Sequence, residues 1–322
     1  MATEELLEPV AADLQEFERR LGDSIAEDLG PMAGAMDLIV KAGGKRLRPA
    51  LVILSSRFGD ADPDHVFNVA MGIEFIHTAT LVHDDLIDNS PTRRGVTTVH
   101  EQLGPSPAII IGDYYFAKGA NLLAGIGEPR IDAAISNAVM TICMGELLQM
   151  TSRNAYDQSM EDYHRKIGRK TATLLSTCCY CGGVVSGLRD TDTDALRRYG
   201  YDLGMAFQIA DDVLDYIASS AEVGKPVGAD LRQGTVTLPL MLALQDRLVG
   251  ERLRAILDQR TLDETDYDRV VQLVRTSPAI TAAERHAHEF AERARDALDG
   301  FEDSAPRRAL ARVCDYVVDR RI

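Results

Sequence analysis

Basic residues are scarce in this chain. It carries 35 Lys and Arg against 50 Asp and Glu, which gives a net charge of −15 over 322 residues. Sequence-independent binding of nucleic acid depends on Lys and Arg that neutralise phosphates, and attraction to anionic lipid depends on the same charges. The chain is therefore not expected to bind nucleic acid or to adhere to an anionic membrane.

Long apolar runs, linkers and paired cysteine clusters are also missing. No apolar run approaches a membrane span, the segment Met1–Val10 is acidic and unlike a signal peptide, and no Gly/Ser-rich linker marks a domain boundary. Cys178, Cys179 and Cys181 crowd into one segment without a second cluster, so a closed zinc site is not indicated. We expect a cytoplasmic protein with buried thiols, no stable membrane insertion and one domain over residues 1–322.

Strand signals are few, and helical periodicity takes their place. Apolar residues from Leu196 to Ile217 recur at alternating steps of three and four, the period of one helix face. The stretch from Asp64 to Asp88, after Pro63, is apolar nearly all round, as in a helix buried in a large bundle. Further helices are expected at about 4–29, 47–58, 106–124, 130–152, 160–186, 236–249, 263–276, 279–298 and 303–320, with the clearest breaks at 43–44, 89–105 and 219–234. The pattern predicts an all-α protein.

Two similar acidic sequences end two of these helical patterns. They are Val82-His83-Asp84-Asp85-Leu86-Ile87-Asp88, which contains the first Asp triplet, and Ile209-Ala210-Asp211-Asp212-Val213-Leu214-Asp215, which contains the second. In each triplet the first and last Asp are four residues apart, so their carboxylates lie on one helix face. Like charges at this spacing repel, and burial makes their ionisation costlier. Clusters of aspartate oxygens suit Mg²⁺, which takes a few carboxylates together with waters and substrate phosphates.

Polar companions make a solvated acidic surface a poor explanation of the pair of triplets. His77 precedes Asp84 by seven residues, and Gln208 precedes Asp211 by three. Basic residues near the two helices are Lys45, Arg46, Arg48, Arg93, Arg94, Lys170 and Lys225. Because arginine and lysine bind phosphate oxygens well, the combination indicates a metal-bridged polyphosphate substrate.

At these residues the sequence resembles the trans-prenyltransferases, the isoprenyl diphosphate synthases of the all-helical class I isoprenoid synthase fold. Six blocks occur in the family's order: Gly43-Gly44-Lys45-Arg46-Leu47-Arg48-Pro49, His83-Asp84-Asp85-Leu86-Ile87-Asp88 with Arg93-Arg94-Gly95, Gly112-Asp113-Tyr114, Gly168-Arg169-Lys170-Thr171, Phe207-Gln208-Ile209-Ala210-Asp211-Asp212-Val213-Leu214-Asp215, and Gly224-Lys225-Pro226. The resemblance implies a large single-domain helical bundle around a central cavity, and it favours a homodimer. It extends to bacterial long-chain members such as heptaprenyl and octaprenyl diphosphate synthases.

The resemblance also implies a reaction and a role for each matching residue. Isopentenyl diphosphate would be condensed with an allylic prenyl diphosphate, such as geranyl, farnesyl or geranylgeranyl diphosphate, in the presence of about three Mg²⁺ ions per active site. The metal ligands would be Asp84, Asp88 and Asp211. Asp85, Asp212 and Asp215 would be further ligands or residues that contact the ligands without binding the metal. The allylic diphosphate would be bound by Arg93, Lys170 and Lys225, and isopentenyl diphosphate by Lys45, Arg48, His77 and Arg94, with Thr171 and Gln208 near the reacting carbons. One family segment often has lysine where this chain has Thr235, so one diphosphate contact has no counterpart here.

Product length in this family depends on how soon the growing tail meets a bulky side chain below the first Asp triplet. On the helix beneath Asp84 lie Ala79 and Thr80, and one turn further Ile76, none of them aromatic. This predicts a deep apolar tunnel and a product of roughly six to ten isoprene units, about C30–C50, since each helical residue adds about 1.5 Å of depth. Met140, Met144 and Leu148 are expected to be ordinary core or to form the facing wall. A quinone side chain would be a suitable use of such a product.

Several alternatives remain open on sequence grounds. A geranylgeranyl or farnesyl diphosphate synthase would share the reaction but release a shorter product. A terpene cyclase of the same fold would ionise a prenyl diphosphate without adding isopentenyl units, and such enzymes usually lack the second Asp triplet. A regulatory subunit would be expected to lose a triplet, whereas the catalytic subunit of a heterodimeric synthase would keep both.

Overall fold

The structure, a computed structural model, describes residues 8–28, 46–93, 95–218, 227–259 and 261–319. Over these ranges the regular structure is helical, apart from a short antiparallel hairpin of Thr92–Arg93 (β1) and Val96–Thr97 (β2). The all-α prediction is therefore confirmed. The chain divides into two compact units: unit 1 is Met1–Asn137, Thr177–Arg197 and Gly300–Leu310, and unit 2 is Ala138–Ser176, Arg198–Asp299 and Ala311–Ile322. The single domain over 1–322 stays a prediction.

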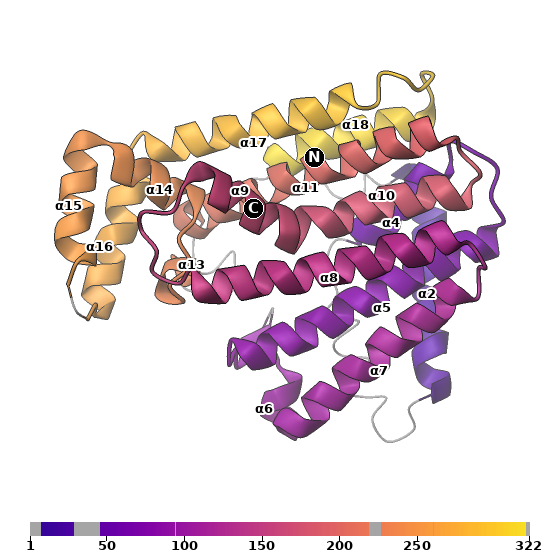
Figure 1. Cartoon of the computed structure of the whole chain (residues 1–322), viewed down its shortest axis with the longest axis horizontal. Coiled ribbons are helices and arrows are strands. Elements are labelled where there is room, and N and C mark those ends of the chain that lie inside the picture. The colour runs from indigo at the N-terminus through magenta and orange to yellow at the C-terminus, as the bar shows by residue number, and fades with distance from the viewer. Residues whose placement is uncertain (1–7, 29–45, 94, 219–226, 260, 320–322) are drawn as a thin grey trace. The chain divides into compact units, whose positions relative to one another are not determined.

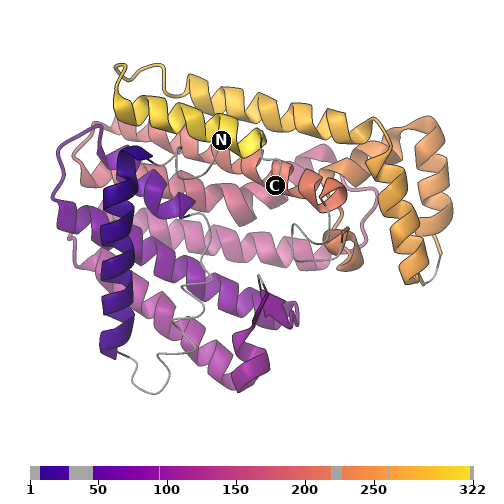
Figure 2. The same cartoon turned by 180° about the vertical axis from the view of Figure 1, so that it is seen from behind.

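Unit 1 is built around one long apolar helix. Its elements are the 3-10 turn η1 (Glu8–Val10), α2 (Ala11–Asp28), α4 (Leu47–Ser56), α5 (Pro63–Ile87), β1, β2, α6 (Val99–Leu103) and α7 (Pro105–Ala124), with the beginning of α8 (Pro129–Thr151) and parts of α10 (Thr173–Val185), α11 (Asp190–Ile217) and α18 (Ala305–Val318). The long helix, α5, begins where the side chain of Asp62 accepts a hydrogen bond from the backbone N–H of Asp64 at 2.9 Å, with Pro63 at the first helical position. It packs against α4 and α7, and α2 packs across α4 and α5 (Figures 1 and 2).

Two glycines let α5 and α7 approach each other closely. A Cβ atom at Gly119 would lie 2.5 Å from the carbonyl oxygen of Gly72, and one at Gly72 would lie 2.7 Å from Cγ of Leu123. These distances are too short for any side chain, so the two backbones are nearly in contact. The first Asp triplet at the end of α5 is therefore carried by a helix held firmly along its length.

Unit 2 consists of shorter helices. They are α9 (Met160–Ile167), a π-helical turn η3 (Gly168–Ala172), α13 (Ala229–Arg232), α14 (Leu238–Gln245), α15 (Arg247–Leu257), α16 (Glu264–Arg275) and α17 (Ala279–Asp296), together with the second part of α8, most of α11 and the end of α18. The helices α14 and α17 pack against each other, and α15 packs against both α14 and α16 (Figure 1). The second Asp triplet lies near the end of α11, within this unit.

The predicted helix boundaries hold for most elements and fail at four places. One helix over 236–249 is wrong, because α14 ends at Gln245 and the extended residue Asp246 accepts hydrogen bonds from Leu248 N and Val249 N to begin α15. One uninterrupted helix over 160–186 is also wrong, because the turn Gly168–Ala172 is π-helical. The expected breaks at 89–105 and 219–234 contain the short helices α6 and α13.

One helix meets the length and composition of a membrane span. Among the described residues, α8 contains an 18-residue window with a mean hydropathy of 1.4, of which 28% is buried. The expectation that no apolar run approaches a span was therefore too strong. Core helices of soluble proteins meet the same criterion, so this is weak evidence for a membrane.

Candidate active site

The first Asp triplet lies at the carboxyl end of α5 in unit 1. Asp88 is the residue that ends the helix, and its backbone N–H donates to the carbonyl oxygen of Asp84 at 2.8 Å. The four-residue spacing within this last turn places the carboxylates of Asp84 and Asp88 on one face, and both residues are half-buried. Two carboxylates so placed are suitable ligands for one Mg²⁺ ion that completes its shell with water or phosphate.

The middle aspartate of this triplet has a partner within the chain. Asp85 is 7% exposed, and both its carboxylate oxygens accept hydrogen bonds from Nε of Arg93 at 2.9 Å, while Nη2 of Arg93 lies 2.8 Å from one of them. Arg93 belongs to the hairpin strand β1, which follows α5 closely. The ion pair therefore fixes the guanidinium next to the first Asp triplet.

The histidine before the first triplet packs against α7. A Cβ atom at Gly112 would lie 2.1 Å from Nε2 of His83, so the imidazole ring would have to move if this residue had a side chain. The same nitrogen is 3.3 Å from the carbonyl oxygen of Ile109 and 3.8 Å from Oδ1 of Asp113. Gly112 in the sequence block Gly112-Asp113-Tyr114 thus lets the imidazole of His83 lie against α7 next to the triplet.

The second Asp triplet, in unit 2, also has an inward-facing middle residue. Asp212 is 2% exposed; Oδ2 accepts a hydrogen bond from the hydroxyl of Tyr163 at 2.7 Å, and Oδ1 accepts one from Nε2 of Gln208 at 2.8 Å. Burial raises the pKa of Asp212 to about 8, and the charge of Asp230 acts in the same direction. The two hydrogen bonds and the nearby Lys166 ammonium lower this pKa and so oppose the effect of burial.

The last residue of the second triplet supports the backbone that follows it. The two carboxylate oxygens of Asp215 accept hydrogen bonds from the backbone N–H groups of Ala229, at 3.1 Å, and Asp230, at 3.2 Å. These are the first residues of α13, whose amino-terminal N–H groups have no partner inside the helix. Asp211, the first residue of the triplet, is half-buried.

A π-helical turn carries two predicted substrate-binding residues. Lys170 and Thr171 lie within Gly168–Ala172, and Lys170 forms an ion pair with Glu146 of α8. A Cβ atom at Gly145 would lie 2.9 Å from the backbone nitrogen of Lys170, and one at Gly204 would lie 2.5 Å from Cα of Ala172. Two helices of unit 2 therefore reach the backbone of this turn through glycines. Single π-helical turns within α-helices are rare and often occur at functional sites.

The remaining predicted residues fall into two groups. Lys45, Arg94 and Lys225 lie outside the described residues, as does the pair Gly43-Gly44. Arg48 and His77 are half-buried residues of α4 and α5 in unit 1. Directly before α4, Arg46 adopts the left-handed conformation with φ of 49° and forms ion pairs with Glu18 and with Glu74, the latter at 3.0 Å.

The predicted chain-length residues lie in the buried part of α5. Ala79 is 2% and Ile76 is 1% exposed, and the hydroxyl of Thr80 donates to the carbonyl oxygen of His77 at 2.7 Å. Ile76 packs against α7, where a Cβ atom at Gly119 would lie 2.8 Å from its Cγ1. The tunnel below Asp84 stays a prediction. Met140 and Met144 are 59% and 50% exposed, so the expectation that they are ordinary core is wrong.

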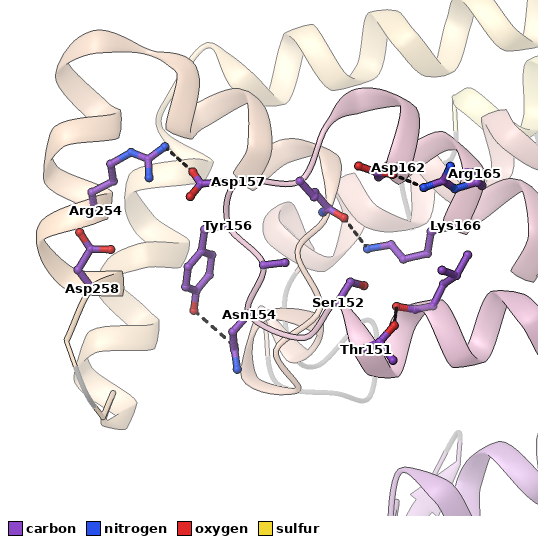
Figure 3. A pocket seen from close by; sticks show the side chains of 13 residues that line it. Thr151, Ser152, Asn154, Tyr156, Asp157, Asp162, Arg165, Lys166, Arg254 and Asp258 are labelled. Atoms are coloured by element: carbon purple, nitrogen blue, oxygen red, sulfur yellow. Dashed lines mark hydrogen bonds and ion pairs between the residues drawn. The ribbon is translucent and has the colours of Figure 1, made fainter.

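Sequence reasoning missed three residues that contact the predicted ones. They are Glu146, Tyr163 and Lys166, which neighbour Lys170 or Asp212. Lys166 lines a cavity of about 530 Å³ in unit 2, which is also bordered by Tyr156, Arg254 and Asp258 and by none of the predicted catalytic residues. Figure 3 shows the side chains around it. In the sequence, Tyr163 lies seven residues before Lys170 and Lys166 lies four residues before it, so all three would share one helix face. This spacing is the one sequence signal that could have indicated that Tyr163 and Lys166 belong to the site.

Comparisons with known proteins agree with this architecture. A profile of the polyprenyl synthetase family matches residues 31–274. Component 2 of the heptaprenyl diphosphate synthase of Geobacillus stearothermophilus is 34% identical over 308 residues, 96% of this chain and 96% of that protein. The octaprenyl diphosphate synthase of Escherichia coli is 32% identical over 322 residues, 99% of each chain. The crystal structure of polyprenyl synthase from Caulobacter crescentus, complexed with calcium and isoprenyl diphosphate, matches with a TM-score of 0.92 at 34% identity, over 100% of this chain and 98% of that one.

These similarities extend over nearly the whole length of the chain and of its relatives. They include the segments that carry both Asp triplets and the π-helical turn, all within the range that matches the family profile. The chain therefore belongs to the polyprenyl synthetase family, and it is a prenyltransferase with the class I isoprenoid synthase fold.

Proposed function

We propose that the protein condenses isopentenyl diphosphate with an allylic prenyl diphosphate, in the presence of Mg²⁺, to give a long-chain all-trans polyprenyl diphosphate. The observation that carries the proposal is the pair Asp84 and Asp88 on one face of the last turn of α5, in a chain of the polyprenyl synthetase family. The Caulobacter polyprenyl synthase is complexed with calcium and isoprenyl diphosphate, which supports a divalent cation and this substrate class.

The carboxylates fit a metal that is bound mainly through its substrate. Among the described side chains, no group of three or more His, Cys, Asp or Glu could by itself hold a metal ion. Mg²⁺ does not need such a cage, because it retains waters and binds substrate phosphates. We assign Asp84, Asp88 and Asp211 as ligands, following the resemblance. When bound, Mg²⁺ would supply positive charge that stabilises the departing diphosphate.

The protein's own cations are already held in place by carboxylates. Asp85 pairs with Arg93 and Glu146 pairs with Lys170, so neither cation needs to be ordered when a diphosphate arrives. Each would exchange part of its pairing with the carboxylate for phosphate oxygens, and its fixed position would stabilise charge as the C–O bond of the allylic substrate breaks. Lys45, Lys225 and Arg94, together with Arg48 and His77, keep the roles that the resemblance implies.

A long product and use in quinone side chains are part of the proposal. The names of the hepta- and octaprenyl diphosphate synthases among the relatives support a long chain, as do Ala79 and Thr80 below the first Asp triplet. A geranylgeranyl or farnesyl diphosphate synthase would share every feature of the reaction and would be recognised by its shorter product.

We further propose that the chain acts as a homodimer. One face of α8 in unit 2 is apolar and exposed: Met140, Met144 and Leu147 are 59%, 50% and 55% exposed, and Met150 is 44% exposed. Contiguous exposed apolar surface of this kind marks an interaction site. The relative named as a component of heptaprenyl diphosphate synthase supports an alternative, in which this chain is the catalytic subunit of a heterodimer.

The direct test is to incubate the purified chain with Mg²⁺, labelled isopentenyl diphosphate and farnesyl or geranylgeranyl diphosphate. We expect a ladder that ends at a long polyprenyl diphosphate and disappears with EDTA. Asp84→Ala and Asp211→Ala should each lower kcat by roughly a hundredfold or more without unfolding the protein, because no core volume is lost. Asp190→Ala is the matched control, since this residue of α11 is 88% exposed and pairs at the surface with Arg130.

Other outcomes would distinguish the alternatives. Near-normal turnover of Asp211→Ala would contradict the assignment of both Asp triplets to metal binding. A cyclic hydrocarbon from the allylic substrate alone would establish a terpene cyclase. Activity that appears only after addition of a second protein, with this chain monomeric on gel filtration, would establish the catalytic subunit of a heterodimer.

A further inference from the structure

We propose that Asp212 is a positioning residue that, together with Tyr163, fixes the side chains of Gln208 and Thr171 for the prenyl transfer reaction, and that it is not a metal ligand. The inference rests on the proposed function, which places Gln208 and Thr171 near the reacting carbons. All four residues belong to unit 2, on α9, the π-helical turn and α11.

The surroundings of Asp212 leave little room for a metal ion. The residue is 2% exposed, and each carboxylate oxygen accepts a hydrogen bond from a different side chain, at 2.7 Å from Tyr163 and 2.8 Å from Gln208. Tyr163 is itself fully buried. On an α-helix, Asp212 points about 100° away from its neighbour Asp211, so the two carboxylates do not share a face.

The same contacts determine which way the amide of Gln208 points. The group of Gln208 that faces Asp212 is the NH₂, because Nε2 donates to Oδ1 of Asp212 at 2.8 Å. The amide oxygen then faces Thr171, whose hydroxyl donates to it at 2.6 Å. The hydroxyl proton of Thr171 is therefore committed to Gln208, and the lone pairs of its oxygen face elsewhere. Rotating the amide of Gln208 by 180° would place its oxygen against the carboxylate of Asp212.

The backbone of this cluster is held as well as its side chains. Thr171 lies in the π-helical turn, which α8 and α11 approach through Gly145 and Gly204 at distances that no side chain would allow. The hydroxyl of Thr173 donates to the carbonyl oxygen of Gly168 at 2.9 Å across the turn. The hydrogen bonds from Gln208 to Asp212 and from Thr171 to Gln208 thus join a constrained turn to α11, which carries the second Asp triplet.

A buried lysine, Lys166, lies near Asp212. Lys166 is 5% exposed, and its ammonium donates to the carbonyl oxygen of Val236 at 3.0 Å and to Oε1 of Gln158 at 3.4 Å. Burying an acidic and a basic side chain is costly, and apolar residues of similar volume would often be no less stable. Two such side chains in a buried place are better explained by the orientation that they give to their hydrogen-bonding partners.

The test compares three variants with the wild-type protein in single-turnover and steady-state assays of prenyl transfer. Tyr163→Phe keeps the ring and removes only the hydroxyl, and we expect kcat to fall roughly tenfold. Asp212→Leu removes the anchor of Gln208, and we expect kcat to fall roughly a hundredfold. In both variants KM for the allylic diphosphate and the Mg²⁺ concentration for half-maximal activity should change less than about twofold. Tyr199→Phe is the control, because this fully buried tyrosine of α11 bonds the thiol of Cys314 and should leave kcat unchanged.

A double-mutant cycle separates positioning from a merely structural effect. If Asp212 and Tyr163 act through Gln208, then Tyr163→Phe should have no further effect on kcat in a Gln208→Ala background. Calorimetric titration with an unreactive allylic thiolodiphosphate and Mg²⁺ should give wild-type affinity for Tyr163→Phe and Asp212→Leu, and thermal unfolding should show that both are folded.

Three results would overturn the inference. They are an unchanged kcat in folded Tyr163→Phe and Asp212→Leu, an Mg²⁺ requirement raised in Asp212→Leu as much as in Asp211→Ala, and effects that multiply independently with Gln208→Ala. Failure of the proposed function would look different, because the wild-type protein would then form no polyprenyl product at all.

Discussion

Asp85 and Asp212 occupy the same place in their triplets and have similar surroundings. Each is almost fully buried and accepts hydrogen bonds from its own chain, Asp85 from Arg93 and Asp212 from Tyr163 and Gln208. A helix turns by about 100° per residue, so when the first and last Asp of a triplet share one face, the middle Asp points toward the helix's neighbours. In each Asp-Asp-x-x-Asp sequence, the first and last carboxylates thus share one helix face, whereas the middle carboxylate is buried and hydrogen-bonded within the chain.

The residue at which product length can be tested is Ala79. It is 2% exposed in α5, five residues before Asp84, and a phenyl ring there would fill the space that we assign to the growing tail. We expect Ala79→Phe to shorten the product by at least one isoprene unit, at a cost in stability of about 1–3 kcal/mol from overpacking. Chromatography of labelled products measures the change, and Ala79→Val should give an intermediate distribution. The same products from wild type and folded Ala79→Phe would show that the tail runs elsewhere.

At the scale of elements, the π-helical turn Gly168–Ala172 is the feature with the greatest consequence for the site. Within this turn, Lys170 forms an ion pair with Glu146, and the hydroxyl of Thr171 donates a hydrogen bond to Gln208. Its backbone is in close contact with α8 and α11, so small changes in those helices are transmitted to both side chains. Close packing makes such a contact sensitive to one added methyl group.

Gly145→Ala tests this dependence. The new Cβ would lie 2.9 Å from the backbone nitrogen of Lys170, so the π-helical turn must move. We expect kcat to fall roughly tenfold and the protein to lose about 1–3 kcal/mol of stability. Gly22→Ala is the matched control, because a Cβ in this position of α2 meets nothing within 4 Å and should stabilise the protein by about 0.5–1 kcal/mol. Full activity of Gly145→Ala would mean that the turn's position does not limit the reaction.

At the scale of the whole molecule, one face of α8 carries several exposed apolar side chains. Met140, Met144, Leu147 and Met150 lie on it. The thiol of Cys143 lies among them and is exposed, so the expectation of buried thiols is wrong for this cysteine. A second copy of the chain would cover this face and protect the thiol.

We therefore expect Met144→Glu to convert a dimer to a monomer and to make Cys143 reactive. Sedimentation measures the first change, and alkylation at about pH 8 followed by peptide mapping measures the second. Burial raises the pKa of Cys178 and of Cys314 to about 12 in each case, so these thiols stay protonated and unreactive in that experiment and would begin to react only as the pH approaches that value. A dimer in which Cys143 is alkylated as fast as in Met144→Glu would place the interface elsewhere.

The sequence alone determined the class of fold, the positions of most helices and the residues of both Asp triplets. Apolar periodicity follows directly from which side chains must leave water, and a motif such as Asp-Asp-x-x-Asp lies within one turn of one helix, so both are local properties. The family followed from the same local blocks.

Only the tertiary structure decided what the residues contact. The break at Asp246, the π-helical turn, the partners of Asp212 and the exposure of Met140 and Met144 depend on residues distant in the sequence. An apolar stripe has the same period whether the chain itself or another molecule covers it. A buried aspartate likewise carries no mark of its hydrogen-bond donors, because Tyr163 lies 49 residues away and meets Asp212 only after the helices have packed.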